Sequence, residues 1–316
     1  MNYINRLMKK LQSIIKITVI SFVISVAAAA GQSAATEVSR GFALLQSENF
    51  TAAAQTFAAV LQTDPHHYEA RVGLAIALIG VERFADASRE IAKLLSRRPK
   101  DPKLLEMAAQ TFWRQNRFVE TETVLRRLID LGGAGAEIWA LYGDALDAQK
   151  KTPEAVLAYR EAVRLRPDSI DYRYALGSLY WKSIDYAAAE AEFLEILRRA
   201  PKEPRASFNL GDIYLSKGQA AKALPFLETA AAAFAGEFDT RLAYGRALAA
   251  VNQFEKAATE LEAAVKLKPE IPEGHFQLGL ALQRTGRRAE AAAAFKEAKR
   301  LQDAKREAEK VQPQPK

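Results

Sequence analysis

Small and large apolar side chains recur along this 316-residue sequence at a fixed interval of 34 positions. Small residues return at one register, in the series Gly41, Ala75, Ala109, Gly143, Gly177, Gly211, Gly245 and Gly279. Large side chains follow 16 positions behind, in the series Phe57, Ile91, Leu125, Tyr159, Phe193, Leu227, Leu261 and Phe295. The phase runs from residue 34 to residue 305 without an insertion or deletion, which indicates a repeat protein.

Within each interval the apolar positions have helical spacing in two segments, separated by short turns such as 216–218 and 284–286. Each interval therefore predicts a pair of antiparallel helices. A glycine inside a helix costs about 1 kcal/mol relative to alanine, so the glycine register needs a reason. We expect the small residue of the first helix to face a small residue of the second. The two backbones would then approach closely, with the large apolar side chains filling the space beside them.

Several intervals carry a known pattern of residue types. The fourth contains Trp139, Gly143, Ala155, Tyr159 and Pro167, in the order and spacing of the tetratricopeptide repeat. The sequence resembles this family over residues 34–305. The pattern is weaker in the first three intervals and where the closing proline is missing, at Arg40, Ala75, Ala109, Thr121, Gly133 and Ala235.

The resemblance implies an all-α fold, a right-handed α-solenoid superhelix of eight helix–turn–helix units. The expected units are 34–67, 68–101, 102–135, 136–169, 170–203, 204–237, 238–271 and 272–305. A single hairpin cannot bury both of its faces, so we expect neighbours to stack into one continuous core. An α-helical bundle without repeats is the alternative. Residues 306–316 are expected to be a charged extension of the last helix, to about residue 310, followed by a disordered tail.

Residues 1–30 have the features of an export signal. Arg6, Lys9, Lys10 and Lys16 precede an uncharged run over 17–30, which ends in four alanines. A basic start, a short apolar segment and a small-residue exit are typical of a cleaved signal peptide. An uncleaved membrane anchor is the alternative. We expect the rest of the chain to be periplasmic or secreted, or to be periplasmic repeats held by an inner-membrane anchor.

The net charge of +7 is no argument for a nucleic-acid partner, because residues 1–30 supply +4 of it. The chain has no cysteine, which excludes disulfides, thiolate metal sites and a cysteine nucleophile. No motif of a known catalytic or nucleotide-binding class appears, so we expect neither an enzyme nor a cofactor. His66, His67 and His275 have no ligand set near them in sequence, and we expect solvated imidazoles rather than a metal site.

In proteins that this sequence resembles, the first helices of successive units line a groove that holds a partner peptide or helix. The corresponding candidates here are Trp113, Tyr174, Ser178, Trp181, Phe208, Asn209, Asp212, Arg246 and Phe276, with Glu106, Gln110, Asp144, Asp147, Gln277 and Arg284 beside them. Tyr174, Trp181 and Phe208 would form an aromatic anchor of the kind found at binding hot spots. The alternative for Trp113 and Trp181 is packing between helices.

Asn209 lies where some family members hold a partner's terminal carboxylate. That clamp also needs basic residues on the flanking first helices, and Tyr174, Ser178, Asp239 and Ala243 stand at those positions. We therefore predict no chaperone-type carboxylate clamp, and expect Asn209 to bond helix to helix. The sequence predicts an exported, non-catalytic scaffold for a protein partner, with envelope assembly or secretion as its expected role. The alternative is an accessory protein in carbohydrate or exopolysaccharide handling or export.

Overall fold

The computed structural model describes residues 32–311, and these residues form helices and turns without a strand. The described helices are α2 (Gln32–Gln46), α3 (Phe50–Thr63), α4 (Tyr68–Gly80), α5 (Phe84–Arg97), α6 (Pro102–Arg114), α7 (Phe118–Asp130), α8 (Ala136–Ala148), α9 (Thr152–Leu165), α10 (Ile170–Lys182), α11 (Tyr186–Arg199), α12 (Pro204–Ser216), α13 (Ala220–Ala233), α14 (Phe238–Ala250), α15 (Phe254–Leu267), α16 (Pro272–Arg284) and α17 (Arg288–Val311). The all-α prediction is confirmed.

Helix starts repeat with the sequence period. From α4 onward the even-numbered helices, here called first helices, begin at evenly spaced positions, namely Tyr68, Pro102, Ala136, Ile170, Pro204, Phe238 and Pro272. Proline suits the first turn of a helix because its missing N–H has no partner there. Side chains of Asp101 and Glu203 also cap two of these starts by accepting backbone N–H groups.

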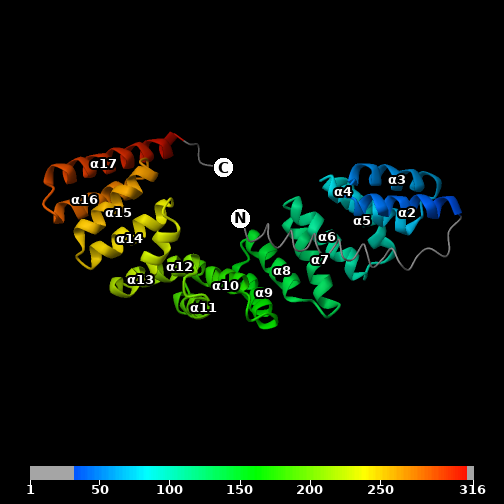
Figure 1. Ribbon diagram of the computed structural model, residues 1–316, viewed down its shortest axis with the longest axis horizontal. Helices are drawn as coiled ribbons and strands as arrows, with labels where there is room; N and C mark the ends of the chain where they lie inside the picture. Colours follow the sequence, from blue (N-terminus) through cyan, green and yellow to red (C-terminus); the bar gives the residue numbers. More distant parts are fainter. Residues whose placement is uncertain (1–31, 312–316) are drawn as a thin grey trace. The chain divides into compact units, whose positions relative to one another are not determined.

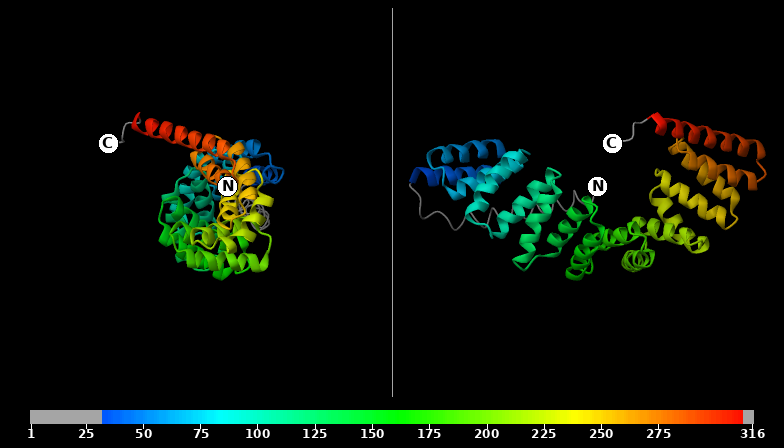
Figure 2. Two further views of the ribbon diagram at one scale, coloured as in Figure 1. Left: turned by 90° about the vertical axis from the view of Figure 1, so that its left-hand side faces the viewer. Right: turned by 180° about the vertical axis from the view of Figure 1, so that it is seen from behind.

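The chain divides into two compact parts, residues 1–172 and residues 173–316, and the boundary falls within α10. Inside each part, consecutive helices lie side by side in chain order (Figure 1 and Figure 2). An apolar cluster around Ile91 and Leu125 joins helices α4 to α8 in the N-terminal part. Another, around Leu248, Leu261 and Leu282, joins α14 to α17 in the C-terminal part. Each helix pair is thus buried by its chain neighbours, as expected of an α-solenoid.

The glycines of the repeat register are needed because large side chains pack directly against them. A Cβ atom at Gly211 would lie 2.6 Å from Leu227 Cγ, and one at Gly177 would lie 2.9 Å from Phe193 Cε1. The large side chain 16 positions later therefore occupies the space beside each glycine. Close backbone approach is also present, because the same Gly211 Cβ would lie 3.4 Å from the Ala223 carbonyl oxygen. The large side chain thus fills the space that a Cβ atom at the glycine position would need.

A hydrogen bond from a side chain to a backbone carbonyl spans the turn before several first helices. Arg241 Nε donates to the Ala235 carbonyl at 3.1 Å, and His275 Nε2 lies 2.8 Å from the Pro269 carbonyl oxygen. Both residues occupy the fourth position of a first helix and bond six residues back along the chain. His275 is partly exposed, and its imidazole thus has a partner in the turn besides solvent.

One residue after each first helix has a left-handed backbone, again at the interval of the repeat. These residues are Glu48, Glu82, Asn116, Lys150, Ile184, Gly218, Asn252 and Gly286, with φ between 57° and 80°. Glycine and asparagine tolerate this conformation, whereas a β-branched side chain is strained in it. Ile184, with φ 64° and 72% of its surface exposed, is the least suited residue of the series.

We expect Ile184→Asn to stabilise the protein by about 1 kcal/mol, because it relieves left-handed strain and the lost side chain is largely exposed. The reciprocal change at the same register, Asn252→Ile, is expected to destabilise by a similar amount. Urea denaturation of both variants measures the two effects. A loss of stability in Ile184→Asn would show that this side chain contributes packing that outweighs its strain.

The predicted signal segment, residues 1–30, and the end of the predicted tail lie outside the described residues. Helix α17 continues to Val311, one residue past the expected end of the extension. Across residues 32–311, none of the helices combines the length and the apolar character needed to cross a bilayer.

Candidate functional site

The exposed sides of the first helices in the C-terminal part form the candidate surface, which we call the first-helix face. It comprises α10 from residue 173 onward, α12, α14 and α16. Helix α12 contacts α14, and α14 contacts α16. On each helix, residues four and seven positions apart share one side, as Tyr174, Ser178 and Trp181 do on α10.

Three predicted residues from three helices come together on this face. The Trp181 indole and the Arg246 guanidinium both act on the Asp212 carboxylate. Burial raises the pKa of Asp212, while its interactions with the Trp181 indole and with the charge of Arg246 oppose that rise. Trp181 remains 40% exposed. The alternative that it only packs between helices therefore does not describe the whole side chain.

Tyr174 and Asn209 form a second contact between α10 and α12. Asn209 Nδ2 donates to the Tyr174 hydroxyl at 3.0 Å and to the Arg205 carbonyl at 2.9 Å. The prediction that Asn209 bonds helix to helix is confirmed. The Arg205 guanidinium lies 4.6 Å from the Tyr174 ring centroid, and the Phe193 ring is 5.9 Å away. These neighbours leave Tyr174 half-buried. It therefore packs α10 against α12 more than it offers surface to a partner.

The other predicted residues differ in how much surface they offer. Ser178 and Phe208 are half-buried, whereas Phe276 is 46% exposed and has the Phe295 ring 5.8 Å away. Gln277 donates to Glu273 at 2.7 Å. Arg284 lies over the Phe254 ring at 4.4 Å. The predicted trio of Tyr174, Trp181 and Phe208 therefore contains one exposed residue, Trp181.

Two residues of this face were missed by sequence reasoning. Leu280 lies one turn after Phe276 on α16 and is an exposed large hydrophobic residue. The spacing from Phe276 could have identified it. Arg205 covers the Tyr174 ring and forms an ion pair with Glu203 at 2.8 Å. Its role depends on a neighbouring unit, and no local pattern signals it.

Candidates in the N-terminal part are more deeply packed. Trp113 is half-buried against the apolar cluster, with the Phe118 ring in an edge-on contact at 5.2 Å. This agrees with the packing alternative. Gln110 is buried, and burial raises the pKa of Glu106, with Lys103 opposing the shift. These three residues offer little free apolar surface to a partner.

Asp144, on α8, is the most perturbed acid of the described chain. Tyr159 donates its hydroxyl to Asp144 Oδ1, while Oδ2 is buried without a hydrogen-bond partner. The pKa of Asp144 is raised to about 7, chiefly by burial and also by the charge of Asp147, while the Tyr159 hydrogen bond opposes the rise. Tyr159 stands in the large-residue register, where every other residue is apolar. The two polar groups therefore occur as a matched pair.

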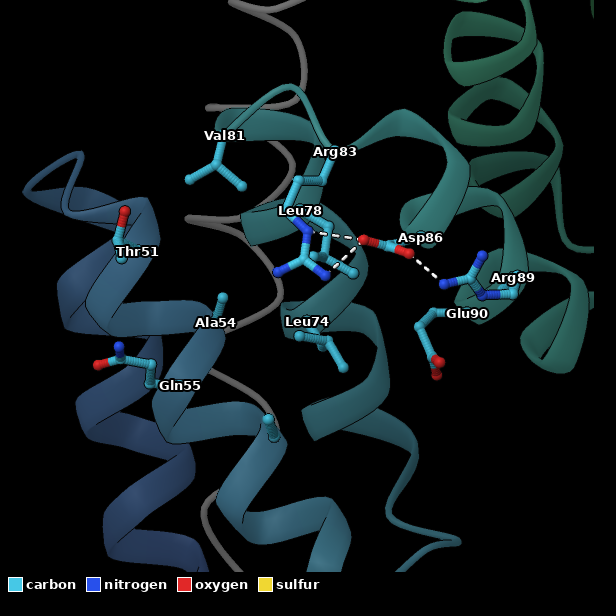
Figure 3. A pocket seen from close by; sticks show the side chains of 11 residues that line it. Thr51, Ala54, Gln55, Leu74, Leu78, Val81, Arg83, Asp86, Arg89 and Glu90 are labelled. Atoms are coloured by element: carbon cyan, nitrogen blue, oxygen red, sulfur yellow. Dashed lines mark hydrogen bonds and ion pairs between the residues drawn. The ribbon is translucent and has the colours of Figure 1, made fainter.

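A pocket of about 460 Å³ opens elsewhere, between α3, α4 and α5 of the N-terminal part (Figure 3). Its floor is apolar, with Leu74 and Leu78 from α4. Its charged groups are already paired: Arg83 Nε donates to Asp86 at 2.6 Å, and Lys93 Nζ donates to Glu90 at 2.8 Å. Figure 3 shows Asp86 bridged to Arg83 on one side and Arg89 on the other. These charged groups are therefore already engaged with one another.

The histidines have structural contacts. His67 accepts the Ala70 N–H at 3.4 Å as the cap of α4, and His66 lies 2.5 Å from an Arg97 nitrogen. Within residues 32–311, histidine and acidic side chains nowhere gather in threes or more as a metal site would need.

Comparison with known families assigns the class of this protein. Models described as tetratricopeptide repeat match residues 44–111, 174–238 and 272–305, and one described as TPR repeat matches 143–183 and 245–286. Together these matches span well over half of the chain. The chain belongs to the tetratricopeptide repeat (TPR) family, and its fold is that of a protein-interaction scaffold. A search of curated proteins gives no match to the sequence.

Solved structures agree with the fold. A structure of MamA residues 41-end from Desulfovibrio magneticus RS-1 is 26% identical, with a TM-score of 0.51, and covers 54% of this chain and 97% of its own. The MamA RS-1 ArsTM double mutant is 25% identical, with a TM-score of 0.51, covering 55% and 97%. YrrB, described as a TPR protein with an unusual peptide-binding site, is 20% identical, with a TM-score of 0.52, covering 57% and 92%. At that identity the likeness to YrrB concerns the fold alone.

Proposed function

We propose that this protein is an exported, non-catalytic scaffold that binds a partner polypeptide on the first-helix face of residues 173–316. The single observation that carries the proposal is the arrangement around Trp181. An aromatic ring that is 40% exposed interacts through its indole with the Asp212 carboxylate of the neighbouring first helix, so it is positioned without being covered. A fixed aromatic side chain loses little conformational entropy on binding, which suits a hot spot.

Export is part of the proposal and is supported by the sequence of residues 1–30. A basic start followed by a short apolar run favours passage across the inner membrane and a site of action in the envelope or outside it. Envelope assembly or secretion is the role that we infer. Amino-terminal sequencing of the exported protein distinguishes a cleaved signal, with a new start near residue 31, from a retained anchor.

Affinity capture from an envelope extract tests the binding proposal. We expect a specific partner to be retained by the wild-type chain and lost with Trp181→Ala. Leu194→Ala is the matched control, because Leu194 is 42% exposed and lies on α11, outside the first-helix face. Loss of the partner with both variants, or with neither, would contradict the assignment of this face.

Carbohydrate handling is the competing function, since exposed aromatic rings also stack on sugars. Tyr174 is poorly placed for stacking, because Arg205 lies over its ring. Glycan-array binding that depends on Trp181, together with no protein captured, would favour this alternative over a protein partner.

A further inference from the structure

Arg246 is the exposed basic group at the centre of the first-helix face. It lies on α14, between α12 and α16. Its side chain is exposed and makes no hydrogen bond or ion pair with the described residues. Most other arginines of the C-terminal part have such a partner: Arg173 pairs with Glu192 at 2.8 Å, and Arg205 pairs with Glu203 at 2.8 Å.

Asp212 does not neutralise Arg246. The Asp212 carboxylate interacts with the charge of Arg246, but the two groups do not form an ion pair, and the carboxylate also interacts with the Trp181 indole. Asp239 lies in the first turn of α14, seven residues from Arg246, where the helix dipole stabilises a carboxylate. Arg246 therefore presents a positive charge that a partner can compensate.

Apolar side chains flank this charge on the neighbouring helices. Phe276 and Leu280 are exposed on α16, and Trp181 is exposed on α10. Packed helices lie about 8–10 Å apart, so α16 is one such spacing from Arg246 and α10 about two. An extended peptide advances about 3.3 Å per residue. A segment crossing the face would thus place a residue on α16 about three positions from the one that meets Arg246.

We infer that the partner segment is an acidic peptide, with an Asp or Glu side chain on Arg246 and a bulky apolar residue about three positions away on Phe276 and Leu280. This inference rests on the proposed function and specifies its ligand. A carboxylate matches the guanidinium through paired, charge-assisted hydrogen bonds. A nucleic acid is the less suitable anion, because the exposed side chains that flank Arg246, Phe276 and Leu280 on α16 and Trp181 on α10, are apolar and offer no track for successive phosphates.

The test selects 12-residue random peptides on the full chain by phage display and measures the affinity of selected peptides by fluorescence anisotropy. We expect the selected sequences to pair an acidic residue with Leu, Phe or Trp two to four positions away. Arg246→Glu should weaken their binding about tenfold or more, and the acid-to-lysine peptide should restore it. Added salt should weaken wild-type binding, because the charge pair is exposed.

Lys256→Glu is the matched control. It reverses an exposed charge on α15, the helix paired with α14, and should leave the affinity unchanged. Selected peptides without an acidic residue, or equal binding by Arg246→Glu, would overturn the inference while leaving a peptide-binding face intact. Displacement of the peptide by a single-stranded DNA oligonucleotide would also overturn it. If the selected peptides bind Trp181→Ala and Phe276→Ala as tightly as they bind the wild-type chain, the result would instead count against the proposed function.

Discussion

Asp144→Asn is expected to stabilise the protein at pH 8 by about 1–3 kcal/mol and to have little effect at pH 4. Burial raises the pKa of Asp144 to about 7, above the value of about 3.9 for an unfolded aspartate. The folded state therefore holds this proton more tightly than the unfolded state. As the pH rises from 4 through 7, the wild-type protein loses stability at this residue. Asparagine carries no charge, so the variant escapes the loss.

Urea denaturation at pH 4, 6 and 8 measures this difference, with Asp168→Asn as the control because Asp168 is an exposed aspartate of the same part. Tyr159→Phe extends the test. Removing the hydroxyl that donates to Asp144 should destabilise the wild-type protein at pH 8 and should matter less when residue 144 is asparagine. A stabilisation by Asp144→Asn that is equal at pH 4 and pH 8 would show that Asp144 is not held with a raised pKa.

Gly211→Leu is expected to destabilise the protein by about 1–3 kcal/mol or more. Its Cβ alone would lie 2.6 Å from Leu227 Cγ and 2.8 Å from Leu227 Cδ2. Leu227 is fully buried, and the Ala223 carbonyl oxygen would also lie 3.4 Å from the new Cβ, so the added side chain must open the contact between α12 and α13.

Gly236→Leu is the matched control for this change. A Cβ at Gly236 would meet no atom within 4 Å, so the same substitution there should alter the free energy of unfolding by less than about 0.5 kcal/mol. Urea denaturation compares the two variants. Equal effects at both positions would mean that loss of a glycine, rather than its packing against Leu227, determines the outcome.

The helices could be predicted from sequence because they follow from local spacing. Phase, turns and prolines place each helix within a few residues, and the fixed interval carries from one pair to the next. Gly218 and Asn252 lie one interval apart, and both residue types tolerate the left-handed backbone found at this turn position. It could not indicate that Ile184 is strained there, because the backbone angle of a turn residue is not visible in its side-chain pattern.

The sequence could predict which helix face forms the candidate site, but not which side chains on it contact one another. Helical spacing placed Trp181 and Asp212 on first helices, but the interaction between their side chains joins two neighbouring units. The sequence likewise placed Asp144 on a first helix without its link to Tyr159. Contacts between side chains of different helices depend on rotamers and on burial. The spacing of residues along the sequence gives no information about either.

Each helix pair is held by its neighbours in chain order, and this packing leaves the first helices with a free face. Hydrogen exchange of Gly211→Leu tests this most directly. We predict that amide protection falls most in α12 and α13, falls less in α11 and α14, and stays unchanged in α2 to α5. An equal loss of protection in α2 to α5 would contradict packing by chain neighbours.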